Sequence, residues 1–262
     1  MVVGLDHFSE YFSSDKEHYV LIGGSACYAH FEEVGLPFRA TQDLDIVLCV
    51  ETLSEDFSDK FKDYIRLGSY EVAQRSSDLR KCFYRFQKPQ SPGFPRTIEL
   101  FSRRGDLIEN RYPTAAPLPI ADSADSLSAL LLNDDYYSFI VENKVLVRGL
   151  SIASDVCLIA LKVRAWLDLS QKKNEGKPDS NDIRKHKLDV FRLARLLPTN
   201  LKQSVLAPDT IKKDIMEFLV AMEQEEVDLR VIGGKQEVLL MTVARHFGLP
   251  DFIQKEQKAT EA

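Results

Sequence analysis

The stretch that decides the fold is Tyr19–Val50, YVLIGGSACYAHFEEVGLPFRATQDLDIVLCV. It opens with a short apolar run, Tyr19–Ile22, which a Gly-Gly pair ends, and this pattern is typical of a buried strand. A helix over residues 25–34 is predicted to end at Gly35. Asp43–Val50 is rich in β-favouring residues and predicts a second strand. The stretch therefore predicts a strand, a glycine turn, a helix, a loop and a second strand.

The glycine turn, Gly23-Gly24-Ser25, is a first candidate binding site. A turn of small residues that leads into a helix exposes backbone N–H groups at the helix start, and these groups favour a phosphate together with the helix dipole. Glycine lets a phosphate approach closely, and Ser25 can add a hydroxyl donor. A turn of this composition also connects a strand to a helix without any further role, and that alternative stays open.

Asp43 and Asp45 are a second candidate site. Residues i and i+2 of a strand point to the same face, which places the two carboxylates on one side with Cα atoms about 7 Å apart. Carboxylates that close repel each other unless a cation neutralises them. Oxygen ligands suit Mg²⁺ (or Mn²⁺). Because the rest of the strand, Ile46–Val50, is apolar, we favour a metal site at the strand end over a plain solvated surface.

Glu99 lies in a later predicted strand, Arg96–Phe101. Alternation places Thr97, Glu99 and Phe101 on one face of that strand. An acidic side chain in an apolar strand costs free energy if it is buried without a partner, and a metal shared with the aspartates would remove the cost. The alternative is a glutamate on an edge strand that faces water.

Composition limits the kinds of protein that this chain can be. Its 262 residues carry a net charge of -6, which argues against a general nucleic-acid coating role but allows a local basic site. The four cysteines have no metal-ligand spacing, so free thiols in a reducing compartment are expected. We find no apolar run of membrane-spanning length and no secretion signal pattern, and we expect a cytoplasmic protein with no membrane partner.

Hydrophobic spacing predicts the remaining elements. Helices are expected over 6–18 and 53–67, strands over 70–75, 81–86 and 96–101, a connector over 113–122, and a hairpin that pairs 136–141 with 144–152. From residue 153 apolar residues recur at helical spacing, with a polar loop over 171–181 and further helices over 182–197, 208–224 and 235–247. The sequence therefore predicts a mixed α/β domain, residues 1–152, and an all-helical domain, residues 153–262.

These residues together resemble the nucleotidyltransferase superfamily that includes DNA polymerase β. The resemblance rests on Gly24-Ser25, Arg39-x-Thr41-x-Asp43-x-Asp45 and the later carboxylate Glu99. The RxTxDxD form is similar to that of the AbiEii-type nucleotidyltransferases, many of which are toxins of toxin–antitoxin systems. The resemblance implies an α+β nucleotidyltransferase fold, a mixed sheet flanked by helices, with an all-helical C-terminal domain that closes the nucleotide cleft.

Two segments extend the resemblance into the helical part. Ala160–Ala165 is similar to the family's lysine-bearing helix, whose lysine reaches the nucleotide triphosphate. The lysine here, Lys162, falls within the apolar periodicity of its helix and must either snorkel or meet an anion. The family places an aspartate soon after that helix, and Asp182 or Asp189 could fill the role. Helix chemistry alone also explains Asp182, because acidic residues are favoured in a first turn.

The resemblance implies a magnesium-dependent enzyme that moves a nucleoside monophosphate from a nucleoside triphosphate to a hydroxyl group. The implied metal ligands are Asp43, Asp45 and Glu99, and the implied catalytic set adds Lys162 and Asp182. The nucleotide is expected to contact Gly24, Ser25, Arg39, Thr41, Lys162 and Lys185. For Arg39, pairing with Glu32 or Glu33 is an equal alternative.

The acceptor is expected to be an RNA or tRNA end or a protein side chain, and a cognate antitoxin is a candidate partner. Basic clusters at Arg103-Arg104, Lys172-Lys173 and Arg184–Lys187 could supply an RNA track, although charged loops are usually only solvated. Two other functions stay open. One is a non-catalytic nucleotide-binding module on the same fold. The other is a small-molecule nucleotidyltransferase of the antibiotic-modifying kind, which would need a closed acidic pocket.

Overall fold

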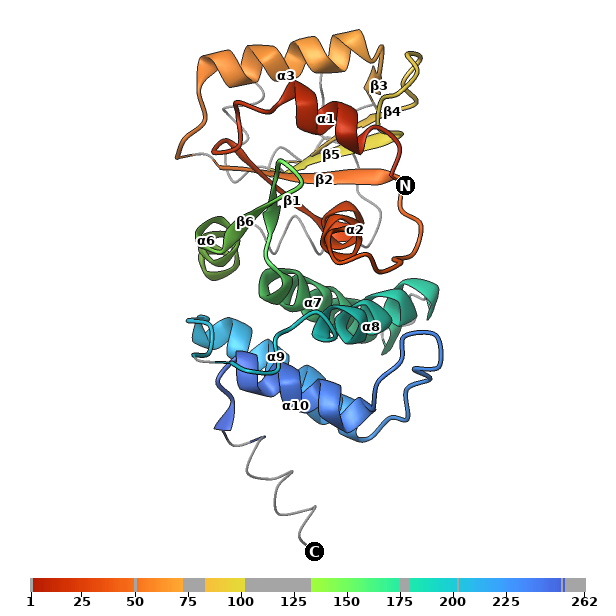
Figure 1. Cartoon of the computed structure of the whole chain (residues 1–262), viewed down its shortest axis with the longest axis vertical. Helices are drawn as coiled ribbons and strands as arrows, with labels where there is room; N and C mark the ends of the chain where they lie inside the picture. Colours follow the sequence, from red (N-terminus) through yellow and green to blue (C-terminus); the bar gives the residue numbers. More distant parts are fainter. Residues whose placement is uncertain are drawn as a thin grey trace, which may run out of the picture. The chain divides into compact units, whose positions relative to one another are not determined.

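The computed structural model describes residues 2–49, 51–72, 83–101, 133–174, 180–201, 203–250 and 252 (Figure 1). The expected turn at 76–78, the connector at 113–122 and the Arg103-Arg104 cluster lie outside the described residues. The chain divides into two compact units, Met1–Ser154 and Asp155–Ala262.

The first unit is built on a mixed sheet, as the sequence predicts. Its seven described strands lie in the order β3-β4-β5-β2-β1-β7-β6. Two neighbouring pairs, β2–β5 and β1–β7, are parallel, and the other pairs are antiparallel. The strands are β1 (Tyr19–Ile22), β2 (Asp43–Leu48), β3 (Glu71–Val72), β4 (Phe83–Gln87), β5 (Thr97–Phe101), β6 (Lys144–Val147) and β7 (Leu150–Ala153).

Helices cover both faces of this sheet. α1 (Leu5–Tyr11) and α3 (Glu55–Leu67) lie on one face, and α2 (Gly23–Glu33) lies on the other (Figure 1). Aromatic contacts fix the first face, since Tyr19 packs edge-on against Phe8 of α1 and Phe86 of β4 lies against Phe61 of α3. The buried residues Leu44, Ile46, Ile98 and Leu100 share that face by register. The alternate residues of β2 and β5, among them the predicted carboxylates, therefore face the α2 side.

The expected hairpin between 136–141 and 144–152 is wrong. Residues 136–141 belong to a helix, α6 (Asp134–Glu142), although their aromatic and β-branched composition favours a strand. The Asn133 side chain caps this helix by accepting from the backbone N–H of Asp135 at 2.9 Å, and two aspartates occupy its first turn.

The hairpin in this region is instead formed by β6 and β7. Its turn contains Arg148 and Gly149, whose φ angles of 51° and 78° fit a two-residue primed turn, the kind that matches the twist of paired strands. The segment 144–152, expected to supply one strand of a hairpin, thus supplies both.

The second unit is all-helical in its described residues, as predicted. It consists of α7 (Asp155–Asn174), α8 (Ser180–Ala194), α9 (Asp209–Glu223) and α10 (Gln236–His246). α7 packs on α8 and α9, and α10 packs on α8 and α9. α7 continues to Asn174, so the first residues of the segment expected to be a polar loop, from residue 171, are helical. None of the described helices combines the length and apolar character needed to cross a membrane.

Candidate active site

The three predicted carboxylates lie on one face of neighbouring strands. In the parallel pair β2–β5, Asp45 is directly opposite Glu99, and Asp43 is opposite Thr97. Residues opposite each other across a pair of strands point to the same face, and Asp43 shares that face because it is two residues from Asp45. Asp43 is exposed at the start of β2, whereas Asp45 is partly buried. The sheet thus places the three acidic residues on one face, and the alternation predicts this for Asp43 and Asp45.

The glycine pair does not form a separate turn. Gly23 and Gly24 are the first two residues of α2, and Gly23 has a left-handed φ of 69°. A Cβ on Gly23 would lie 1.7 Å from Asp45 Oδ2, and a Cβ on Gly24 would lie 2.5 Å from Thr41 Oγ1. Both distances are too short for a side chain. The glycines are therefore required because Asp45 and Thr41 pack directly on the first turn of α2.

Ser25 completes this contact. It is fully buried, and its hydroxyl donates a short hydrogen bond to the backbone carbonyl of Asp43. The hydroxyl predicted to donate to a phosphate is therefore engaged with the backbone of the acidic strand. Through this bond Ser25 holds the start of β2 against α2.

Arg39 reaches the same helix start. Its Nη2 atom lies 3.6 Å from where a Cβ of Gly24 would be, and its guanidinium lies 5.2 Å from the centre of the Phe38 ring. Glu32, one of the two acidic residues considered as its partner, forms an ion pair with Arg148. The first turn of α2 therefore has the Asp45 carboxylate and the Arg39 guanidinium beside it.

Glu99 has a partner that the sequence analysis missed. Arg85 of β4 is directly opposite Glu99 in the antiparallel pair β4–β5, and its Nε donates to Glu99 Oε1 at 2.8 Å while Nη2 donates to the same oxygen. No local pattern in the sequence records the register that places Arg85 opposite Glu99. In the part of the chain that the structure describes, no three His, Cys, Asp or Glu side chains gather so as to hold a metal ion.

In the helical unit, Lys162 meets an anion and does not snorkel. Its Nζ lies 3.5 Å from Asp189 Oδ2, and the two side chains are 7% and 0% exposed. Arg192 pairs with the other oxygen of Asp189 at 2.9 Å. Asp182, the other candidate aspartate, is paired with Lys185 at 3.6 Å on the surface of α8. Of the two aspartates left open by the sequence, Asp189 is therefore the one that contacts Lys162.

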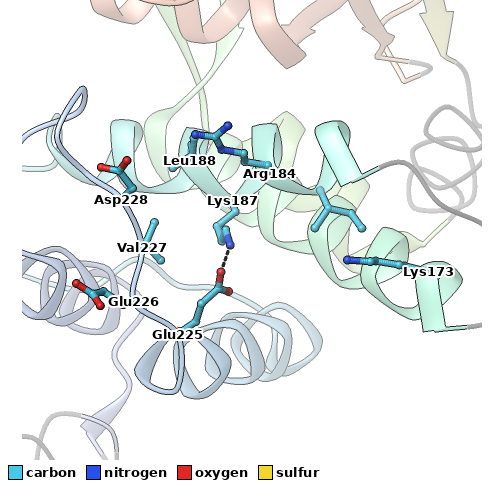
Figure 2. Close-up of a pocket in the computed structure, with 9 residues that line it drawn as sticks. Lys173, Arg184, Lys187, Leu188, Glu225, Glu226, Val227 and Asp228 are labelled. Atoms are coloured by element: carbon cyan, nitrogen blue, oxygen red, sulfur yellow. Dashed lines mark hydrogen bonds and ion pairs between the residues drawn. The ribbon is translucent and has the colours of Figure 1, made fainter.

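Part of the expected basic track lines a pocket within the helical unit (Figure 2). The pocket has a cavity volume of about 310 Å³. Lys173, Arg184 and Lys187 come from α7 and α8, and the acidic residues opposite them, Glu225, Glu226 and Asp228, follow α9. Lys187 forms an ion pair with Glu225. The lining therefore carries both signs of charge, in contrast to the open basic groove that an RNA track requires.

Comparison with known proteins finds distant structural likeness only. No protein-family model and no curated protein matches the chain. A solved structure of the antibiotic-resistance factor ANT(2'')-Ia is similar over 84% of this chain and 94% of that chain, with 10% identity and a TM-score of 0.39. The crystal structure of JHP933 from Helicobacter pylori is similar over 98% of this chain and 95% of that chain, with 12% identity and a TM-score of 0.33. Both TM-scores are below 0.5, and a likeness at this level establishes neither a shared fold nor a shared activity.

Proposed function

We propose that this protein is a magnesium-dependent nucleotidyltransferase that moves a nucleoside monophosphate from a nucleoside triphosphate to a hydroxyl acceptor. The observation that carries the proposal is the packing of the acidic strand on the start of α2. Asp45 lies against Gly23, Thr41 against Gly24, and the Asp43 backbone is bonded to Ser25. A carboxylate pair and a helix N-terminus are thereby held side by side, which suits a cation and a phosphate chain bound together.

Asp43 and Asp45 fit a single Mg²⁺ ion. They offer two carboxylates on one face of a strand end, one exposed and one partly buried, and magnesium in nucleotide sites is held by one or two carboxylates plus waters and phosphates. When bound, the ion would neutralise charge on the phosphates and polarise the reacting phosphoryl group. Arg39 adds a fixed positive charge beside the first turn of α2, where it would orient the phosphates.

In this proposal Lys162 supplies a second cation, from the helical unit. Burying a lysine side chain costs free energy unless a carboxylate lies beside it, and Asp189 is in that position. Asp189 would therefore act by fixing the position of the Lys162 side chain. Lys185, paired with Asp182 on the surface, would contribute at most to the outer part of a nucleotide site.

The acceptor class follows from the resemblance to AbiEii-type proteins. We propose an RNA or tRNA end, or a protein side chain, as the acceptor, and toxin activity controlled by a cognate antitoxin. The mixed charge of the pocket lined by Arg184 and Lys187 gives no support to an RNA track at that place.

The test is incubation of the purified protein with each of the four labelled nucleoside triphosphates, Mg²⁺ and total RNA or cell lysate. We expect label transfer that Asp45→Asn abolishes and that Asp63→Asn, a surface substitution on α3, leaves unchanged. Absence of transfer from every nucleotide, with folded protein, would refute the proposal. Magnesium-dependent nucleotide binding without transfer would identify a non-catalytic nucleotide-binding module instead.

A further inference from the structure

We propose that Arg85 is a positioning residue of the candidate metal site, which holds one carboxylate oxygen of Glu99 in place and leaves the other oxygen for the metal. The proposal rests on the proposed function for the metal itself and for Glu99 as a candidate ligand. It goes beyond that function by giving a role to Arg85, a residue that the sequence resemblance does not include.

Both bonds from Arg85 go to the same oxygen of Glu99. Nε donates to Oε1 at 2.8 Å, and Nη2 donates to Oε1 as well. Arginine and a carboxylate frequently pair through two nitrogens and two oxygens, and that geometry occupies the whole carboxylate. Here the second oxygen, Oε2, takes part in no hydrogen bond or ion pair with the described residues. One oxygen of Glu99 is thus fixed, and the other is left for a ligand.

The register of the sheet places Glu99 between Arg85 and Asp45. Arg85 is directly opposite Glu99 in the pair β4–β5, and Asp45 is directly opposite Glu99 in the pair β2–β5. The three residues therefore share one face of the sheet, in one row across three strands. Arg85 comes from the strand on the far side of Glu99 from Asp45. A cation bound at Asp45 would accordingly have Glu99 as its neighbour, with Arg85 behind it.

Holding Glu99 in advance lowers the cost of binding a metal. Within the described residues no three acidic, histidine or cysteine side chains gather so as to hold a metal, so a cation must draw the carboxylates together. Ordering a glutamate side chain at that step costs conformational entropy. The Glu99 side chain is only 12% exposed and already bonded to Arg85, so part of that cost is met before the metal arrives. Groups that hold a metal ligand in this way typically change metal affinity by about 10–100-fold.

Replacing Arg85 by lysine separates the position of Glu99 from the charge beside it. Lysine keeps the positive charge, but its ammonium group is a point charge on a flexible stem and cannot supply two bonds from one rigid plane. We expect Arg85→Lys to raise the dissociation constant of Mn²⁺ by about 10-fold. Glu99→Gln should raise it by at least as much. The double variant Arg85→Lys/Glu99→Gln should match Glu99→Gln alone, because Arg85 acts through Glu99.

The measurement is a Mn²⁺ titration followed by electron paramagnetic resonance, in the presence of the α,β-methylene analogue of each nucleoside triphosphate. Circular dichroism checks that each variant is folded. The matched control is Arg66→Lys, since Arg66 pairs with Asp63 on the surface of α3 and its replacement should change the dissociation constant by less than about 2-fold.

The outcomes separate the role of Arg85 from the proposed function. An unchanged Mn²⁺ affinity in Arg85→Lys, or an equally large loss in the Glu99→Gln background, would overturn the proposal. Mn²⁺ binding by the wild type that Asp45→Asn abolishes would still support the proposed function in that case. If the wild type binds no Mn²⁺ with any analogue, the proposed function and the role of Arg85 are both refuted.

Discussion

The carboxylate of Asp45 lies where a side chain of Gly23 would begin, since a Cβ on Gly23 would fall 1.7 Å from Asp45 Oδ2. Gly23 also has a left-handed φ of 69°, a conformation that costs other residues about 1–2 kcal/mol. Two separate requirements therefore select glycine at this position. The first is the backbone angle, and the second is the space that the acidic side chain occupies.

We predict that Gly23→Ala destabilises the protein by more than the backbone angle alone explains. Gly35 is a matched control, because its φ of 70° is nearly the same while a Cβ there would meet nothing within 4 Å. Gly35→Ala should cost about 1 kcal/mol of unfolding free energy, and Gly23→Ala at least about 1 kcal/mol more, since Asp45 must move. Urea denaturation measures both. Equal losses in the two variants would show that Asp45 does not pack on Gly23.

Ser25→Ala should lower the unfolding free energy by about 1–2 kcal/mol, because it removes the donor to a buried backbone carbonyl. Ser14→Ala is the control, since Ser14 makes an exposed hydrogen bond to its neighbour Asp15 and should change stability by less than about 0.5 kcal/mol. Urea denaturation of both variants is the measurement. A neutral Ser25→Ala would mean that the hydroxyl is available for a ligand after all.

The buried pair Lys162–Asp189 should be strongly coupled, whereas the surface pair Lys185–Asp182 should not. The pairs are a matched set, because both join a lysine to an α8 aspartate at about the same distance, 3.5 and 3.6 Å, and differ in burial. In double-mutant cycles with Lys→Met and Asp→Asn, we expect a coupling free energy of about 2 kcal/mol for the buried pair. For the surface pair we expect less than about 0.5 kcal/mol. Similar values would show that Asp189 does not hold Lys162.

Alkaline pH should unfold the protein through its buried tyrosines. Burial raises the pKa of Tyr19 to about 12, and it also raises the pKa of Tyr64 and Tyr70. Because the unfolded chain releases these protons near pH 10, the unfolding free energy should be unaffected below pH 10 and fall as the pH rises through 10–12. The measurement is urea denaturation along a pH series.

Tyr19→Phe should reduce that fall by about 1.4 kcal/mol per pH unit between pH 10 and 12, the contribution of one proton. Absorbance of the phenolate at 295 nm gives an independent check, because the folded protein should ionise only part of its nine tyrosines near pH 10. Complete ionisation at that pH without unfolding would contradict the prediction.

Sequence alternation was sufficient to predict the faces of the strands but not their neighbours. The two-residue period places Asp43 with Asp45 and puts Glu99 on one face of its own strand, and the structure has both features. Register between strands depends on contacts that no local pattern records. For that reason the sequence could not show that Arg85, from a third strand, is opposite Glu99.

Two further differences have identifiable physical causes. The segment 136–141 has the composition of a strand, but the cap at Asn133 and the two aspartates after it favour a helix. The sequence predicts a turn at Gly23-Gly24 because glycine is common in turns. The real cause of the glycine pair is the close approach of Asp45 and Thr41, two residues more than fifteen positions away, which only the folded chain shows.

The position of β1 between β2 and β7 also has a consequence for the order of folding. On one side β1 pairs with β2, which soon follows it, but on the other side Leu21 is opposite Ile152 of β7. During synthesis, one edge of the most buried strand has no partner until the chain has been extended past residue 152. An unpaired apolar strand edge is a template for association with other chains. Nascent chains that stop before β7 should therefore be the species that aggregate, and the first unit should become resistant to protease only when β7 has left the ribosome.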